Sequence, residues 1–424
     1  MGRFARTGAM VGVLVLTASL ALTGCGDDQK KAEFVNGSGP TAASATPGTS
    51  AAPATSAPVA AAGATLQVSP ANGAAKRPVS TEISAKIPGG GKVSEVVLTA
   101  AGGDKVEGRL RRDGSSWVPS SPLKYGTRYT ATVTGTGTDG QTHEGTSTFT
   151  TMAKPTSMIG SGLYLFDGKT YGVGMPVVAE FSPGIPEKDR AAVQKRMFVR
   201  TDPPQPGAWH WLYNGTQAYY RAPEFWQPGT TITVRLGLAG MPLSNGRYGN
   251  VDRTATAKIG RSFVMKVDNA SKKMSVYEGG TLTRTLPVSL GKKSTPSSSG
   301  TMVVMEKKES TVFDTRDEPD PANQYVTKID FAQRLTWGGE YIHSAPWSEG
   351  AQGKRNVSHG CVNVSAVNAR WLFQKTLIGD PITVSGTERK LVPGNGWTAW
   401  SMSWSEFVKG SALPVPDGGA GPAF

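Results

Sequence analysis

Cysteine is scarce in this 424-residue sequence, which contains only Cys25 and Cys361 and no CxxC pair. The spacings typical of zinc fingers are therefore missing. After the first 24 residues, no segment approaches the roughly 18 consecutive apolar residues that a transmembrane helix needs. Long helical patterns are few, whereas glycine (53 residues) and proline (29 residues) are abundant. This composition predicts short strands joined by many turns, in a mostly β protein of about two to four domains.

Residues 1–24 are predicted to be a secretory signal. Arg3 and Arg6 precede an apolar run from Gly8 to Leu22, which is the order of regions in such signals. The run ends in Leu-Thr-Gly-Cys, which resembles the lipobox of bacterial lipoproteins, where the cysteine receives the lipid. Ordinary cleavage beside an incidental Cys25 is the alternative. We therefore expect a protein anchored to the membrane through Cys25, on the outer face of the cytoplasmic membrane and reaching into the cell wall.

Positive charge predominates in the sequence. Lysine and arginine number 45 against 32 acidic residues, and the formal net charge is +13. Such a balance favours anionic partners. Nucleic acid is the usual partner of a basic protein, but an exported lipoprotein does not meet it, so anionic wall polymers and lipid headgroups are the expected partners.

The rest of the chain divides into a tether, three β-rich regions and a tail. Residues 25–64 consist mainly of small and polar residues and proline, and they are predicted to form a disordered tether. Short alternating segments in residues 65–153 and 154–260 predict two related β-sandwiches, the first with a hairpin around Asp139 and Gly140 and with Trp117 in its core. Longer strand patterns begin at residue 261 and define a third domain over 261–386. The tail, 387–424, is rich in tryptophan and is expected to pack back on this third domain.

Two local features within these regions are also informative. A helix is predicted in the third domain, with Ser365 as its N-cap, Gly379 at its end and Val367, Trp371 and Leu372 on one side. In the second domain, seven aromatic residues could bind a glycan, although core or interdomain packing is the more common role of such residues on strands. They are Trp209, Trp211, Tyr213, Tyr219, Tyr220, Phe225 and Trp226. His210 lies among them and is interpreted as structural.

Two of the four histidines, His343 and His359, lie close before Cys361. A cysteine nucleophile needs a base, a group that orients the base, and N–H donors for the oxyanion of a tetrahedral intermediate. His343 follows a predicted strand, so its ring can project from a rigid edge. Gly360 permits a tight turn, in which its amide and that of Cys361 could both point toward a bound carbonyl. The pattern therefore indicates nucleophilic catalysis by Cys361.

Two other interpretations of Cys361 remain open at this point. A lone cysteine can be a buried and inert core residue. Alternatively, His343, His359 and Cys361 could bind zinc, but the short spacing of the last two favours a turn over a chelate. We expect no metal and no cofactor.

The segment His-x14-Ser-His-Gly-Cys-Val-Asn, which begins at His343, resembles the signature of the L,D-transpeptidase catalytic domain. The sequence SAPWSEGAQG after His343, the Ser-Thr-Pro segment within 294–300, and the two preceding domains resemble the actinobacterial lipoprotein members of that family. The resemblance covers nearly the whole chain after residue 64. It implies a mostly β fold with two immunoglobulin-like β-sandwiches, followed by a β-rich L,D-transpeptidase catalytic domain with one or two helices.

The same resemblance implies the roles of the catalytic residues. Cys361 is the nucleophile and His343 the general base, whose ring is oriented by the backbone carbonyl of Ser344. His359 and Gly360 complete the catalytic group. Pairing with the imidazole is expected to lower the pKa of Cys361.

Substrate-binding roles follow from the resemblance for Tyr325, Asn363, Ser358 and Trp347, with Tyr325 lining the oxyanion site. The segment 305–323 occupies the place of the family's active-site lid.

The implied reaction joins two peptidoglycan stem peptides. Cys361 attacks a tetrapeptide stem, D-alanine leaves, and an amine of a second stem resolves the thioester to give a 3→3 cross-link. Carbapenem β-lactams are the expected covalent inhibitors. Alternatives are an L,D-carboxypeptidase, if water resolves the thioester, and a catalytically inactive wall-binding lipoprotein. A sortase would need a catalytic arginine at a strand end, whereas Arg370 lies in the predicted helix.

Overall fold

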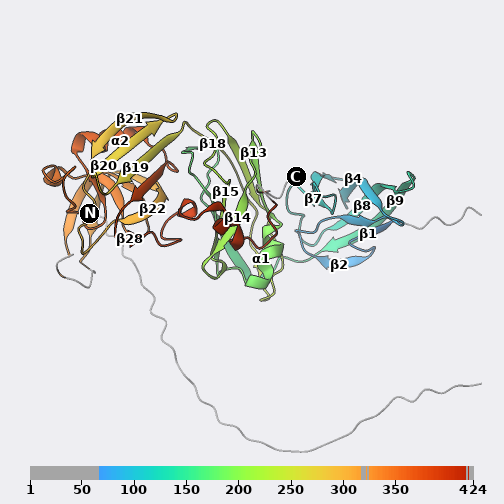
Figure 1. The fold of residues 1–424 in the computed structure, drawn as a ribbon. Helices are drawn as coiled ribbons and strands as arrows, with labels where there is room; N and C mark the ends of the chain where they lie inside the picture. Colours follow the sequence, from blue (N-terminus) through green and yellow to red (C-terminus); the bar gives the residue numbers. More distant parts are fainter. Residues whose placement is uncertain (1–65, 317–320, 322–323, 417–418, 420–424) are drawn as a thin grey trace, which may run out of the picture. The chain divides into compact units, whose positions relative to one another are not determined.

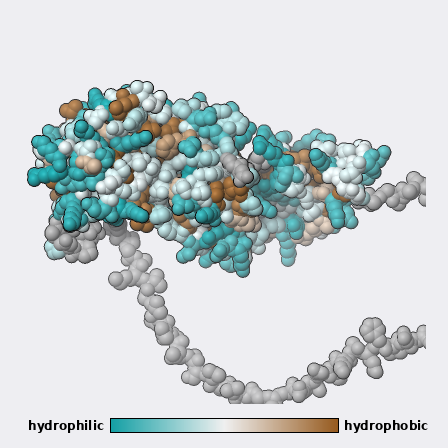
Figure 2. All heavy atoms as spheres, viewed as in Figure 1, coloured by the Kyte–Doolittle hydropathy of each residue, from teal (hydrophilic) through white to brown (hydrophobic). Residues whose placement is uncertain are grey.

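The computed structural model describes residues 66–316, 321, 324–416 and 419 (Figure 1). The predicted signal, Cys25 and the predicted tether lie outside the described residues. No helix in the described part of the chain is long and apolar enough to cross a membrane. Hydrophilic residues predominate on the face seen in Figure 2, and apolar residues form scattered patches there.

The first region is a β-rich domain built around a buried core that includes Trp117, as predicted. Its largest sheet has the strand order β2-β9-β8-β4-β5. Strand β8 alternates buried and more exposed residues, because it covers the core with one face only. The antiparallel β8–β9 pair confirms the hairpin predicted around Asp139 and Gly140. The strands are β1 (Gln67–Ser69), β2 (Ala74–Arg77), β3 (Ser84–Lys86), β4 (Gly91–Ala100), β5 (Lys105–Val106), β6 (Gly108–Leu110), β7 (Trp117–Pro119), β8 (Arg128–Gly137) and β9 (Thr142–Thr151).

The second region has two sheets, with the orders β14-β15-β12-β10-β17 and β11-β18-β16-β13. Most of its aromatic cluster is buried in the core, including Trp209, Tyr219 and Trp226, which supports the packing interpretation over glycan binding. A short helix, α1, was not predicted from the sequence. The elements are β10 (Met158–Leu163), β11 (Thr170–Tyr171), β12 (Val177–Ser182), α1 (Glu187–Gln194), β13 (Met197–Asp202), β14 (Ala208–Leu212), η1 (Tyr213–Gly215), β15 (Gln217–Arg221), β16 (Thr231–Leu236), β17 (Tyr248–Gly249) and β18 (Arg253–Ile259).

The third region combines a six-stranded sheet, β21-β20-β19-β27-β22-β28, with a four-stranded sheet, β23-β24-β25-β26. The second of these sheets carries the candidate active site. The strands are β19 (Phe263–Asp268), β20 (Lys273–Glu278), β21 (Thr281–Pro287), β22 (Ser298–Val303), β23 (Glu306–Asp314), β24 (Val326–Arg334), β25 (Tyr341–Ser344), β26 (Val362–Val364), β27 (Pro381–Ser385) and β28 (Arg389–Lys390), and η3 spans Pro346–Ser348.

Helix α2 (Ala366–Lys375) begins where the sequence predicts, with the Ser365 hydroxyl accepting the amide hydrogen of Asn368. It ends four residues before Gly379. The reason is that Thr376 leaves the helical conformation and bonds the Leu372 carbonyl through its hydroxyl at 2.9 Å. Leu372 faces the core as predicted, whereas Val367 is exposed.

The C-terminal tail packs on both domains. Its first residues pair with β22 and Leu391 joins the catalytic core, as predicted, whereas the part from Trp397 onward packs mainly on the second domain, which was not predicted. Its residues Trp397, Ala399 and Phe407 belong to the core of the second domain. The buried Arg221 of β15 donates to the carbonyls of Ala399 (3.0 Å) and Met402 (2.9 Å). The physical reason is that Arg221 donates hydrogen bonds to carbonyls of the tail, while its guanidinium group and the aromatic side chains of the second domain pack against the tail's tryptophan rings.

The tail itself contains η4 (Ala399–Ser401), α3 (Trp404–Phe407) and η5 (Val408–Gly410). His210 has the structural role predicted for it. Its Nδ1 lies 2.6 Å from the Phe407 carbonyl, and the two rings stack.

Candidate active site

Strands β25 and β26 bring the predicted base and nucleophile to neighbouring positions. They are paired in parallel, with His343 opposite Asn363. Cys361 immediately precedes β26 and is therefore aligned with Tyr341. His343 therefore lies on the neighbouring strand, two positions further along than Cys361. Neighbouring strands are about 4.8 Å apart and residues rise roughly 3.3 Å along a strand, so the two positions are close in space. This register brings together two residues that are 18 positions apart in sequence.

The imidazole of His343 is held in the orientation that a general base needs. The ring is 4% exposed, and its Nδ1 lies 2.8 Å from the carbonyl oxygen of Ser344. Because that oxygen can only accept, Nδ1 carries the hydrogen and Nε2 is left with a free lone pair. Burial lowers the pKa of His343, and the bond to Ser344 raises it by less. The ring is therefore neutral near pH 7, with Nε2 available to take a proton.

The thiol of Cys361 is a protonated, buried group rather than a stabilised thiolate. The residue is 7% exposed, and Sγ lies 3.7 Å from the Gly339 carbonyl, to which it donates. Burial raises the pKa of Cys361 to about 12, against a smaller lowering by the Tyr341 amide. The expectation of a lowered pKa is thus wrong, because the neighbouring imidazole is neutral and water is excluded. The proton must leave during attack, and His343 is the base placed to receive it.

The turn before Cys361 is fixed by hydrogen bonds from two serines. The Ser358 hydroxyl donates to the Cys361 carbonyl at 2.7 Å, and the Ser297 hydroxyl donates to the Gly360 carbonyl at 2.7 Å. Gly360 has φ +122°, a backbone conformation that side chains disfavour, as the sequence predicts. Its amide, however, donates to the Ser358 hydroxyl at 3.2 Å. The expectation that both amides face a bound carbonyl is therefore wrong, and in the described structure only the Cys361 amide is left for that role.

Two of the predicted substrate-binding residues, Ser358 and Asn363, are buried and support the site from beneath. Ser358 stabilises the turn described above. Asn363 donates through Nδ2 to the Ser348 hydroxyl at 3.2 Å and so supports the η3 turn. Trp347 in that turn is 60% exposed, and its ring centroid lies 6.1 Å from that of His343. Of these three residues, Trp347 is therefore the one placed to contact a substrate.

His359 and Tyr325 contact each other beside the catalytic turn. Their ring centroids are 5.0 Å apart, and His359 Nε2 lies 3.0 Å from Lys292 Nζ. Burial and then the positive charge of Lys292 lower the pKa of His359. Within the described residues, no group of three histidine, cysteine, aspartate or glutamate side chains could hold a metal ion. The position of Lys292 beside His359 also argues against the zinc interpretation.

The predicted lid begins as strand β23, which pairs with β24. Phe313 at the end of β23 packs edge-on against His343 at 5.8 Å and against Tyr341 at 4.7 Å between centroids. Residues 317–320 and 322–323 of the lid lie outside the described residues. Phe313 therefore covers the imidazole and keeps water from it, a contact that nothing in the local sequence predicts.

Glu340 is a buried carboxyl group beside the catalytic turn that was not predicted as a site residue. Its Oε1 accepts hydrogen bonds from the Ser298 amide and hydroxyl, both at 2.9 Å, while Oε2 is buried without a partner in the described residues. Burial raises the pKa of Glu340, and its charge in turn disfavours the Cys361 thiolate. Glu340 lies inside the strand predicted before His343, and no local pattern in the sequence marks it as a buried site residue.

Comparison with known proteins shows the family to which the chain belongs. The family model of a bacterial Ig domain matches residues 74–242, and that of the L,D-transpeptidase catalytic domain matches residues 262–384. L,D-transpeptidase 2 of Mycobacterium tuberculosis (strain CDC 1551 / Oshkosh) is 34% identical over 330 residues, which cover 76% of this chain and 79% of the relative. The chain therefore belongs to the L,D-transpeptidase family and is an enzyme of that class.

Two further similarities extend the comparison. L,D-transpeptidase 5 of Mycobacterium tuberculosis (strain ATCC 25618 / H37Rv) is 34% identical over 348 residues, covering 80% of this chain and 74% of the relative. A structure of the L,D-transpeptidase LdtMt1 in complex with imipenem has 31% sequence identity and a TM-score of 0.46, covering 55% of this chain and all of that one. The family relationship confirms the predicted fold class, with immunoglobulin-like structure before the catalytic domain.

Proposed function

We propose that this enzyme forms 3→3 cross-links between peptidoglycan stem peptides through a thioester on Cys361. The observation that carries the proposal is the neutral, oriented imidazole of His343 on β25 beside the buried thiol of Cys361, which immediately precedes the paired strand β26. A buried thiol with a raised pKa is a poor general nucleophile, but it becomes reactive when a bound substrate is attacked while a base removes the proton. Its chemistry is thereby restricted to substrates that fit the site.

In the first half-reaction, His343 Nε2 takes the thiol proton as Sγ attacks the carbonyl of the L-centre of meso-diaminopimelate in the donor stem. The Cys361 amide stabilises the oxyanion. The amide bond to D-alanine then breaks, the leaving amine receives the proton from His343, and a thioester remains. In the second half-reaction, the side-chain amine of a second stem attacks the thioester and its proton passes to His343. The thiolate leaves and recovers the proton, so both groups return to their starting states.

Water would resolve the same thioester to give L,D-carboxypeptidase activity. Phe313 over His343 and the burial of Cys361 favour an amine acceptor, because they limit the water that reaches the base. A disaccharide tetrapeptide, incubated with the full chain, should give free D-alanine and a dimer with the mass of a 3→3 cross-link. Cys361→Ala should give neither while keeping the circular dichroism spectrum. A hydrolysed tripeptide without dimer would instead establish the carboxypeptidase.

We also propose that a carbapenem acylates Cys361, because its strained carbonyl can be attacked by the same thiol. Intact-mass spectrometry should show one adduct on the wild type and none on Cys361→Ala. An equal adduct on the variant would place the acylated group elsewhere and would contradict the assigned nucleophile.

We further propose that the protein is a lipoprotein, anchored through Cys25 on the outer face of the cytoplasmic membrane. The support is the sequence of residues 1–25, where an apolar run ends in Leu-Thr-Gly-Cys. Growth with a clickable fatty acid should label the wild type and not Cys25→Ser. Labelling of both proteins, or of neither, would refute the anchor.

A further inference from the structure

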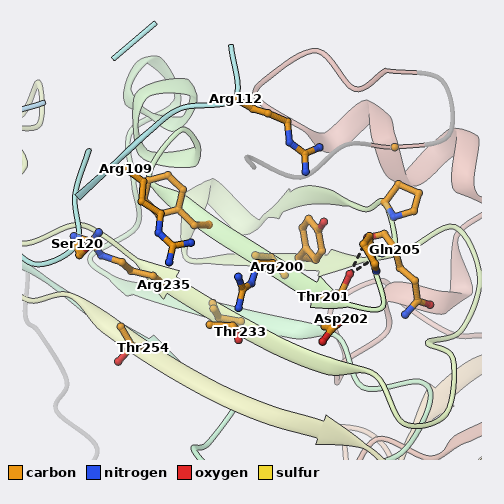
Figure 3. A pocket seen from close by; sticks show the side chains of 17 residues that line it. Arg109, Arg112, Ser120, Arg200, Thr201, Asp202, Gln205, Thr233, Arg235 and Thr254 are labelled. Atoms are coloured by element: carbon orange, nitrogen blue, oxygen red, sulfur yellow. Dashed lines mark hydrogen bonds between the residues drawn. The ribbon is translucent and has the colours of Figure 1, made fainter. Parts of the chain in front are cut away.

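A cleft with a volume of about 920 Å³ lies between the first and second domains, and none of its lining residues belongs to the catalytic domain. Its floor is formed by β13 and β16, which pair in antiparallel fashion. The first domain contributes Arg109 of β6 and the neighbouring Arg112. Figure 3 shows these two side chains extending toward the sheet that carries Arg200 and Arg235. A cleft of this size can hold a compact ligand of several sugar or amino-acid units.

An ion pair and a hydrogen bond to a carbonyl, both made by arginines, join the two domains beside the cleft. Glu82 of the first domain accepts hydrogen bonds from Arg111 of its own domain and Arg196 of the second, both at 2.6 Å. Arg235 pairs with Asp252 at 2.8 Å and donates to the Pro119 carbonyl at 2.6 Å. These three arginines share two carboxylates, Glu82 and Asp252, and have a structural role.

The remaining arginines of the cleft are not compensated in this way. Arg109, Arg112 and Arg200 form no ion pair within the described residues. Asp202 is the one acidic residue among those that line the cleft. Positive charges gathered in one concave site raise the local potential and attract anions. Guanidinium groups also suit phosphate and carboxylate geometry, because each presents several donors in a rigid plane.

We propose that this arginine cleft, formed by Arg109, Arg112 and Arg200, binds an oligoanionic ligand whose charges are phosphate or carboxylate groups. Pro204 and Pro206, in the β13–β14 connection, provide exposed apolar wall surface against which a sugar ring or a peptide backbone can pack. Two sources share this chemistry: a phosphodiester polymer, and the carboxylates of a stem peptide. In either case the cleft would hold the enzyme on its polymer at a point separate from the catalytic cysteine, independently of the reaction proposed above.

The test is calorimetric titration of the full chain at low ionic strength with two probes, inorganic tripolyphosphate and the tripeptide L-Ala-γ-D-Glu-meso-diaminopimelate. Wild type should bind at least one probe, and Arg200→Glu should weaken that binding about tenfold or more, because it replaces a charged donor by a repelling charge. Arg128→Glu is the matched control. It makes the same change of net charge at an exposed position on β8, outside the cleft, and should alter affinity less than twofold.

The probes distinguish the sources, since tripolyphosphate carries only phosphates and the tripeptide only carboxylates as anionic groups. The double variant Arg109→Glu/Arg112→Glu should weaken binding at least as much as Arg200→Glu. Equal losses in Arg128→Glu and Arg200→Glu, or no binding of either probe, would overturn the proposal. Carbapenem acylation of Cys361, measured on the same samples, should stay unchanged in every variant, so failure of the cleft and failure of the proposed catalysis are separable.

Discussion

The buried state of the Cys361 thiol predicts an unusual pH dependence for its chemical modification. Burial raises the pKa of Cys361 from the ordinary value of 9.0 to about 12. At pH 8 an ordinary thiol is therefore about one-tenth thiolate, whereas Cys361 is about one ten-thousandth thiolate, a difference of roughly 1,000-fold. The rate of alkylation by iodoacetamide should rise about tenfold for each pH unit through pH 10, because only the thiolate reacts.

The assay is peptide mapping of Cys361 by mass spectrometry after timed exposure to iodoacetamide between pH 6 and pH 10. The same peptide, alkylated in urea-unfolded protein, is the control, and its rate should level off above about pH 9. Circular dichroism at each pH shows that the native chain is still folded. A native rate that levels off below pH 8 would mean a stabilised thiolate, and it would refute both the burial argument and the concerted role given to His343.

Three further changes test other parts of the structure. His343→Gln should lower the rate of carbapenem acylation about 100- to 10,000-fold, since a general base contributes that much; stopped-flow fluorescence measures it, and a loss below tenfold would contradict the role of the ring as base. In the wild type, acylation should fall only below pH 6.5, because burial lowers the pKa of His343 and the active form is the deprotonated one. Glu340→Gln keeps the acceptor for Ser298 but removes a negative charge beside Cys361, so the alkylation of Cys361 at pH 8 should become faster than in wild type. An unchanged or slower rate would show that the charge of Glu340 does not affect the ionisation of the thiol. Arg221→Ala should lower the free energy of unfolding by about 3 kcal/mol, because it leaves buried carbonyls of the tail without donors. Thermal unfolding by calorimetry measures the change. A loss under about 1 kcal/mol would mean that other contacts hold the tail.

Local patterns in the sequence predicted the features that depend on a few neighbouring residues. The hairpin around Asp139 and Gly140 follows from turn residues between two alternating runs. The start of α2 follows from the capping hydroxyl of Ser365. Gly360 was predicted to adopt a conformation that other residues resist, and its φ of +122° agrees. The bond from His343 to the Ser344 carbonyl joins adjacent residues, so it too lies within reach of a sequence motif.

Contacts between distant segments decided the rest, and no local pattern encodes them. The later part of the tail docks on the second domain because Arg221 meets carbonyls 178 and 181 residues further along the chain. The pKa of Cys361 depends on how completely β25, β26 and their neighbours exclude water from the sulfur, and its value was therefore predicted in the wrong direction. Glu340 and the arginine cleft likewise became visible only when the fold had placed charges from separate strands together. By itself, the sequence determined which groups are able to react, because reactivity depends on residue types and short turns. The tertiary structure decided the protonation and surroundings of those groups, because burial and local charge depend on all the residues packed around them.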